Sequence, residues 1–439
     1  MEYTYLYDFN KERYCRIAER QLICRDDLTS VTVKNGYLLP NRFAPKRCFG
    51  YGGVLDAKKN YVKRSEVNAY SKYAKTPSED DEMEIYLGDG YEIPEKDIAY
   101  LDEDVIYLGY LNNHWGHFLL DSTSRLYPFL KDTEKKYKYA YVVNEGQEYV
   151  PGTSIARFWE LLGISENIIF VNNVTKCKSI TIPEQGFMIN GYYSQEFLDV
   201  FNKVIEGVDC SKYPSYDKVY YARASFKKAQ DSEMGESILL ELFKKNNFTI
   251  IAPEKCTLDE QIAIVRNSNL LVGITGTIPH NLLFAKPGQK MTIINKTHNL
   301  NLAQMDINIM KQVEVCYVDA YLAKFPVLTG EGPFLLDKSA QLTGYFTDHG
   351  WNADMDEQLL QDCRKKNSQA YEKCYRLKKI KQTNLYYEKD ETRFDYFAPD
   401  HLVQYEEALY YLRYPAKRSE HASVFMTRVK RVFRRILGK

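Results

Sequence analysis

The sequence predicts an α/β protein whose second half forms a parallel β-sheet, and three observations support this fold class. After residue 218, strand-like and helix-like segments alternate, which is typical of β-α-β units. Between residues 31 and 182, short β-like runs are interrupted by helical patterns. Within Leu270–Asn295, a glycine-rich turn follows one apolar strand and precedes another. Ligands of parallel sheets bind beyond the carboxyl ends of the strands, where this turn is expected.

Composition narrows the class of protein. The 439 residues are enough for two domains, and 59 Lys and Arg balance 59 Asp and Glu, which gives no general attraction to nucleic acid. The nine Cys include no CxxC pair, so we expect neither a zinc knuckle nor a disulfide framework. The N-terminus lacks the apolar stretch of a signal peptide, and no run is long enough to span a membrane. We therefore expect a cytoplasmic protein.

The first half, 1–208, is predicted to be a domain of short strands with few helices. We expect strands at Val31–Val33, Tyr37–Leu39, Glu84–Leu87, Val105–Leu108, Tyr139–Val143 and Ser179–Ile182, and helices at His114–Tyr127, Ser154–Leu162 and Glu196–Glu206. Residues 209–217 are polar, contain Pro214 and are predicted to be a linker.

The second domain, 218–330, is predicted from its regular alternation. We expect strands at Lys218–Tyr221, Phe248–Ile251, Leu270–Val272 and Met291–Ile294, and helices at Glu233–Lys245 and Leu258–Asn267. Residues 331–416 are expected to form a helical extension with one long helix over Asp354–Gln382. Its apolar stripe would contain Leu359, Cys363, Ala370, Cys374 and Leu377.

The glycine-rich turn is a potential anion site. Gly273 and Gly276 permit a sharp turn and a close approach to a ligand, and Pro279 suits the first position of a helix. The free N–H groups at such a helix start attract anions. The alternative is that the turn only punctuates the fold.

A polar stripe is expected on the helix at His114–Tyr127. One face at helical spacing carries the polar residues His114, His117, Asp121, Ser124 and Arg125, whereas the other faces are apolar. We consider a catalytic role, with Asp121 as general base and His117 orienting it, beside two alternatives. These are a structural hydrogen-bond network and a metal site, for which no third ligand is evident.

Arg223 follows a predicted strand at the ligand-binding edge of the sheet. Arginine binds phosphate oxygens through two parallel hydrogen bonds and keeps its charge at any working pH. The alternative is a surface arginine that packs its stem on the sheet.

Three segments together resemble family 61 glycosyltransferases, in the bacterial branch associated with capsular and other surface polysaccharides. They are NNHWGHFLLDSTSRLYPFL, then YYARASF with SEMGESILLELFKKNNFTIIAPEKCTLDEQIAIV, and LLVGITGTIPHNLLFAKPGQKMTIIN. The resemblance covers roughly Asp102 to Asn295. The chain departs from the family pattern at Thr275, where His is frequent, at His280, where Thr or Ser is frequent, and at Gly235, where Asn is common.

The resemblance implies a GT-B-like architecture with two Rossmann-like domains, and inverting sugar transfer from a nucleotide-sugar donor. The expected catalytic residues are Asp121 and His117, with His114 and Arg125 in support on the acceptor side. The expected donor-binding residues are Arg223, Glu236, Thr275, Gly276, Thr277, His280 and Asn281. No cofactor or metal ion is expected, and the acceptor would be a surface polysaccharide or a lipid-linked glycan. Two other functions are left open: a sugar-phosphate transferase, and a non-catalytic nucleotide-sugar-binding or scaffold subunit.

Residues 417–439 are predicted to be a basic amphipathic tail. This segment has eight basic residues and one acidic residue, Glu420, and Phe425, Val429, Val432 and Ile436 share a helical face. Such a helix suits binding to an anionic membrane surface. We therefore expect peripheral attachment to the inner face of the plasma membrane, and the alternative is packing on the protein's own acidic surface.

Overall fold

The computed structural model describes residues 6–7, 22–43, 50–65, 93, 98–189, 191–223, 225–226, 229, 232–297, 300–321 and 332–386. The chain divides into two compact units, Met1–Ile380 and Lys381–Lys439. The predicted strand at Glu84–Leu87 and the predicted tail at 417–439 lie outside the described residues. The boundaries proposed between the two halves of the first unit remain predictions.

The second half contains the predicted parallel sheet. Its strands lie in the order β1 (Leu6–Tyr7), β17 (Glu314–Asp319), β16 (Lys290–Asn295), β15 (Ser268–Ile274), β12 (Tyr216–Tyr221) and β14 (Thr249–Ile251), and every neighbouring pair is parallel. β1 comes from the N-terminus of the chain and pairs with β17 at one edge. From β12 onward, successive strands are added on both sides of the β12–β15 pair, so the strand order reverses between β12 and β15. Such a point, where the strand order reverses, is the usual ligand site of an open α/β sheet.

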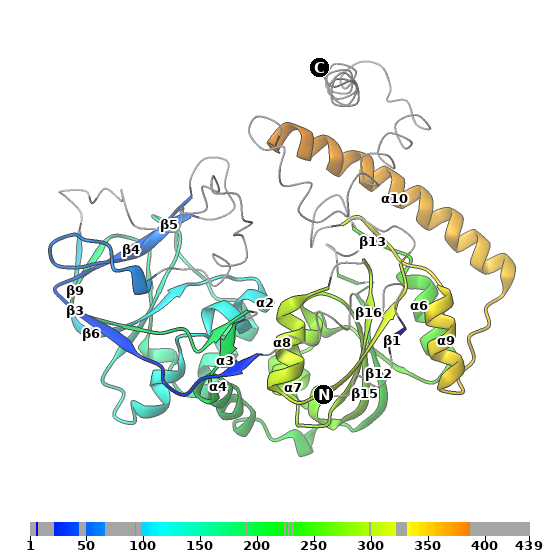
Figure 1. Cartoon of the computed structure of the whole chain (residues 1–439), viewed down its shortest axis with the longest axis horizontal. Helices are drawn as coiled ribbons and strands as arrows, with labels where there is room; N and C mark the ends of the chain where they lie inside the picture. Colours follow the sequence, from blue (N-terminus) through cyan, green and yellow to red (C-terminus); the bar gives the residue numbers. More distant parts are fainter. Residues whose placement is uncertain are drawn as a thin grey trace. The chain divides into compact units, whose positions relative to one another are not determined.

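Helices cover both faces of this sheet (Figure 1). Val219, Leu271 and Ile293 pack with α7 (Leu258–Asn267) and α8 (Leu302–Met310) in one core. Their neighbours Tyr220, Val272 and Ile294 belong to a second core with α6 (Glu236–Lys245) and α9 (Ala340–Asp348). Because successive residues of a strand point to opposite faces, a sheet buried on both sides needs the continuous apolar runs seen in this sequence.

The first half is built on a mixed sheet. Its order is β5 (Gly50–Leu55), β4 (Tyr37–Phe43), β9 (Thr175–Pro183), β6 (Ala99–Tyr110), β7 (Lys138–Val142) and β8 (Ile168–Val171), and β3 (Ser30–Lys34) also pairs with β9. The pairs β9–β6, β6–β7 and β7–β8 are parallel. The helix α3 (Thr153–Leu162) follows β7 along the chain, and the helix α4 (Gln195–Glu206) follows the short strand β11 (Tyr192–Tyr193).

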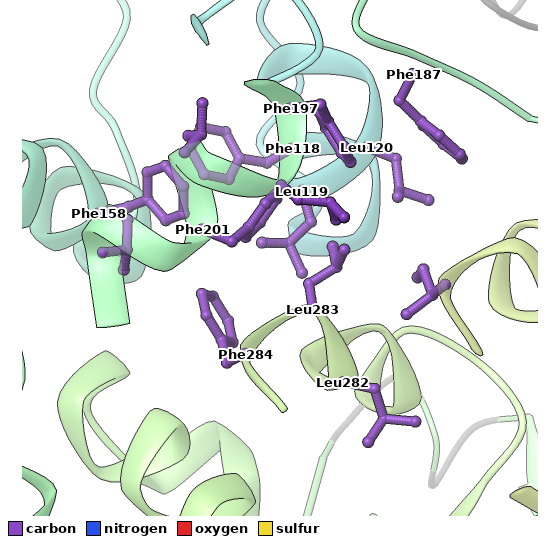
Figure 2. Close-up of a cluster of buried hydrophobic side chains, with 14 of the residues drawn as sticks. Phe118, Leu119, Leu120, Phe158, Phe187, Phe197, Phe201, Leu282, Leu283 and Phe284 are labelled. Carbon is purple, nitrogen blue, oxygen red and sulfur yellow. The ribbon is translucent and has the colours of Figure 1, made fainter. Parts of the chain in front are cut away.

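One hydrophobic core joins the two halves (Figure 2). Phe118, Leu119 and Leu120 from the first half and Leu282, Leu283 and Phe284 from the second half belong to this core, together with Phe158, Phe187, Phe197 and Phe201. The rings of Phe201 and Phe284 meet edge to face, with centroids 5.8 Å apart. Arg157 on α3 also pairs with Asp259 on α7 at 2.9 Å. The two halves therefore meet through a buried apolar core, and the ion pair between Arg157 and Asp259 joins them at the partly exposed margin.

The predicted helix at Glu233–Lys245 begins later than expected. Glu233–Met234 is the strand β13, paired with β18 (Phe334–Leu335), and the helix α6 begins only at Glu236. Gly235 causes this break because its φ is +99° and a Cβ there would lie 1.9 Å from the carbonyl oxygen of Leu336. Only glycine fits such a position.

The expected helix at His114–Tyr127 is wrong as a single element. It consists of one α-turn, α2 (Trp115–His117), and a π-turn, η4 (Phe118–Ser122), followed after a short break by a 3₁₀ turn, η5 (Tyr127–Lys131). The N–H of Thr123 donates to the carbonyl of Phe118, and the hydroxyls of Thr123 and Ser124 donate to the carbonyls of Leu119 and Asp121. Short polar side chains that compete for backbone acceptors in this way disrupt regular helices.

The long C-terminal helix is present as α10 (Glu357–Tyr386), but its predicted apolar stripe is wrong at one end. Leu359 is 46% exposed, whereas its neighbour Leu360 is 5% exposed and packs with α6 and α9. Among the described residues, no helix is long and apolar enough to cross a membrane.

Candidate active site

The carboxyl ends of β12 and β15 lie side by side and lead into the two predicted donor-binding segments. β12 ends at Tyr221, two residues before Arg223, and β15 ends at Ile274, directly before Thr275. Tyr221 pairs with Gly273 in the sheet, so both turns start at the same level. A Cβ built on Gly276 would lie 3.4 Å from Nη1 of Arg223, so the glycine brings the backbone close to the guanidinium.

On the side of the first half, the π-turn positions His117 and Asp121. Nδ1 of His117 donates to Oδ2 of the Asp121 carboxylate over 2.8 Å, and the side chain of Asp121 is 17% exposed. Burial raises the pKa of Asp121, and the contact with His117 opposes this rise. A carboxylate with a raised pKa is a stronger base, and a histidine holds it in place. π-turns of this kind occur frequently at functional sites.

The two halves meet directly at this site. Nε2 of His114 lies 3.4 Å from Oγ1 of Thr277, and Nε1 of Trp115 donates to Oδ1 of Asn281 over 2.8 Å. A Cβ on Gly116 would lie only 3.1 Å from the His280 ring and 3.2 Å from Thr277. The absence of a side chain at Gly116 therefore permits this close packing of the histidine-bearing turn against Thr277–Asn281.

His280 and Asn281 are buried beneath the turn and are held by protein groups. Nδ1 of His280 bonds Oε1 of Gln304 over 2.7 Å, and Nδ2 of Asn281 donates to Oε1 of Gln261 over 3.0 Å. Burial lowers the pKa of His280 to about 4, which keeps its imidazole neutral. The backbone N–H of His280 donates to the carbonyl of Thr277, so this N–H is already used inside the protein.

Arg223 belongs to a buried group of charged residues. Its Nε donates to Oε2 of Glu233 over 2.8 Å, and Nζ of Lys296 donates to Oε1 of the same carboxylate over 2.6 Å. Burial would raise the pKa of Glu233, but Lys296 and Arg223 together hold it below its ordinary value. The Glu236 carboxylate accepts from the backbone N–H of Arg223 over 2.7 Å, and burial raises the pKa of Glu236 to about 7.

Two further residues of the predicted site, Thr275 and Arg125, form hydrogen bonds to other groups of the protein. Oγ1 of Thr275 donates to the carbonyl of Ile294 and to Oδ1 of Asn295, each over 3.1 Å. Arg125 is 3% exposed and donates to the backbone carbonyls of Pro183 and Arg64. These contacts of Arg125 involve none of the residues around His117 and Thr277, and they tie segments of the first half together.

Sequence reasoning missed Glu233, Lys296 and Gln304. Glu233 was expected inside a helix, and Gln304 lies in α8, which the sequence pattern did not distinguish. Lys296 follows β16 directly, at the same edge of the sheet as Arg223, so the rule that identified Arg223 applies to it as well. Within the described part of the chain, no three or more His, Cys, Asp or Glu side chains are grouped to hold a metal ion.

Comparison with models of known protein families gives a match. A search of curated proteins found no similar protein at a significant level. The model of the family described as Glycosyltransferase 61 matches residues 115–292. This range begins on the histidine-bearing turn, ends in β16 and contains the turns that follow β12 and β15. The match supports a family 61 glycosyltransferase domain over these residues.

Proposed function

We propose that this protein is an inverting glycosyltransferase of GT-B-like layout, which moves a sugar from a nucleotide-sugar donor to a surface polysaccharide or glycolipid acceptor. The observation that carries the proposal is that a candidate general base and a candidate phosphate-binding turn lie on neighbouring segments of the two halves. A carboxylate paired with a histidine lies on one side, and a glycine turn beside a cation lies on the other.

The contacts between these groups are continuous. His117 bonds Asp121, and its ring lies 5.1 Å from the ring of His114. His114 lies against Thr277, and the neighbouring Gly276 lies against Arg223. A base and a phosphate-binding group that are joined in this way can act on the two ends of one transfer.

In the proposed reaction, Asp121 removes the proton from an acceptor hydroxyl while that oxygen attacks the anomeric carbon of the donor. The bond between this carbon and the diphosphate oxygen breaks, and the nucleoside diphosphate leaves with inversion at the carbon. His117 orients the carboxylate. Arg223 and the turn Thr275–Thr277 stabilise the negative charge that grows on the leaving diphosphate.

The remaining parts of the proposal concern surroundings. We propose that transfer requires no metal ion because a cation and backbone amides stabilise the leaving group. We also propose that the protein acts in the cytoplasm, where residues 417–439 bind the anionic inner face of the plasma membrane and bring the site close to a lipid-linked acceptor.

The test is nucleotide release from a panel of nucleotide sugars, with and without glycan acceptors and with and without a chelator. The proposal expects release of a nucleoside diphosphate that depends on acceptor and persists with the chelator. Release of a nucleoside monophosphate, with transfer of the sugar phosphate to the acceptor, would indicate a sugar-phosphate transferase. Binding without turnover over the whole panel would indicate a non-catalytic subunit.

A further inference from the structure

We propose that Lys296 is a second cation that contacts the donor diphosphate, and that Glu233 is the residue that positions Lys296 and Arg223 for this purpose. The inference rests on the proposed function, because it concerns the same donor site. Lys296 lies beyond the residues matched by the family model.

The three residues come from three segments that meet at the carboxyl edge of the parallel sheet. Arg223 follows β12, Lys296 follows β16, and Glu233 belongs to β13. Each oxygen of the Glu233 carboxylate accepts from one cation, over 2.8 Å from Arg223 and 2.6 Å from Lys296. One carboxylate therefore fixes the separation between a guanidinium and an ammonium group.

Both cations face the glycine turn. A Cβ on Gly276 would lie 3.4 Å from Nη1 of Arg223 and 3.9 Å from Nζ of Lys296. Since glycine has no Cβ, the cations and the backbone of the turn approach the same small volume. Backbone and cations that converge in this way form the usual environment of a bound phosphate group.

The two cations of this group attract an anion. Arg223 and Lys296 carry two positive charges, and Glu233 carries one negative charge. Glu236, which accepts from the backbone N–H of Arg223, has a pKa of about 7, so a bound anion favours its protonated, neutral form. The side chains of Arg223, Lys296 and Glu233 are only 13%, 7% and 3% exposed, and at such burial a cation attracts an anion more strongly than it does in water.

The rest of the Lys296 environment orients its ammonium group. Nζ lies 4.2 Å from the centre of the Phe334 ring, a distance at which a cation and an aromatic face attract each other. Phe334 belongs to β18, which pairs with the strand that carries Glu233. Lys296 is thus held from two sides, and the pair of cations matches a diphosphate, which has charged oxygens on two phosphorus atoms.

The experiment is calorimetric titration of the full chain with inorganic pyrophosphate and with orthophosphate. We expect the wild-type protein to bind pyrophosphate more tightly than orthophosphate. Lys296→Met should weaken pyrophosphate binding by about 10- to 100-fold, the usual effect of losing one charge-assisted hydrogen bond, and should narrow the preference over orthophosphate. Lys311→Met is the matched control, because Lys311 is also buried but lies at the end of α8, and it should leave both affinities unchanged.

A second variant separates binding from folding. Lys296→Met leaves the Glu233 carboxylate with one cation fewer, so the double variant Glu233→Gln, Lys296→Met removes both charges and restores thermal stability. Weak pyrophosphate binding in this stable double variant supports the inference. Wild-type affinity in either variant, or a wild-type protein without preference for pyrophosphate, would overturn it. If no nucleotide sugar turns over but Lys296→Met still loses pyrophosphate, the proposed function fails and the two-cation site stands.

Discussion

At the scale of single residues, the hydrogen bonds around His280 determine which of its nitrogens carries the proton. Nε2 of Gln304 donates to Asn308, so Oε1 of Gln304 faces His280 as an acceptor. Nδ1 of His280 must therefore carry the proton, and Nε2 keeps its lone pair. Since burial lowers the pKa of His280 to about 4, this neutral form persists throughout the physiological range.

The lowered pKa predicts a loss of stability in acid. The unfolded chain takes up a proton on this histidine below pH 6.5, whereas the folded protein does so only below about pH 4, so stability falls as the pH drops through this window. The difference is worth about 3 kcal/mol in full. We expect the wild-type protein to lose about 2 to 3 kcal/mol more than His280→Gln between pH 7 and 4.5, measured by urea unfolding. Equal losses in both proteins would show that His280 does not titrate in this way.

Gly276 gives a second prediction at this scale. Its φ is +151°, and an added methyl group would stand between the turn and the two cations. Gly276→Ala should lower stability through backbone strain and should also weaken nucleoside diphosphate binding by about tenfold or more, equivalent to about 1.4 kcal/mol.

The matched control for this variant is Gly288→Ala. Gly288 also has positive φ, +74°, but a Cβ there would meet no atom within 4 Å. The substitution Gly288→Ala should therefore lower the melting temperature through backbone strain, as Gly276→Ala does, and should leave nucleotide affinity unchanged. A similar loss of affinity in both variants would mean that strain, and not the blocked approach to Arg223 and Lys296, is responsible.

At the scale of elements, the sequence predicted the helices and strands that have a regular apolar pattern. The helix at Leu258–Asn267 was predicted with its observed bounds, and in the structure Thr257 and Glu260 form a capping box at its start. The start of α6 was missed because the positive φ of Gly235 is set by the carbonyl of Leu336, a residue far away in sequence. The π-turn was missed because the spacing of His117 and Asp121 in the sequence is compatible with an α-helix as well as with a π-turn, so the sequence pattern does not distinguish the two.

The first position of the predicted apolar stripe of α10, Leu359, was wrong for a similar reason. Leu359 and Leu360 are equally apolar, and only their packing partners distinguish them. Leu360→Ala should destabilise the protein by about 2 to 5 kcal/mol because it leaves a cavity against α6 and α9. Leu359→Ala should change stability by at most about 0.5 kcal/mol. Thermal unfolding of both variants is the measurement, and equal shifts would place the buried face of α10 elsewhere.

At the scale of the molecule, the order of strands explains why Arg223 and the glycine turn could be predicted to meet. Both follow strands of one parallel sheet, and neighbouring parallel strands end at the same edge. The segment of the first half that packs near this edge could not be predicted. The core that joins Leu119 to Leu283 depends on contacts between side chains that are distant in sequence. The same limit hid Glu233, which the sequence shows only as one more acidic residue.

The basic tail gives a prediction that concerns the whole chain. Basic residues near an anionic surface contribute about 1 kcal/mol each, so the full chain should sediment with vesicles that contain anionic lipid. A chain ending at Pro415 should remain in the supernatant, and vesicles of neutral lipid should retain neither protein. Equal sedimentation of the two chains with anionic vesicles would end the proposal of membrane attachment through residues 417–439.

The central claim is that Asp121 from the first half and Arg223 from the second half serve one transfer reaction. The most direct test measures the rate of transfer and the donor affinity of Asp121→Asn and Arg223→Gln side by side. Asp121→Asn should slow transfer by about 10²- to 10⁴-fold, the usual contribution of a general base, with unchanged donor affinity. Arg223→Gln should weaken donor binding instead. Normal transfer by Asp121→Asn, or normal donor affinity in Arg223→Gln, would contradict the claim.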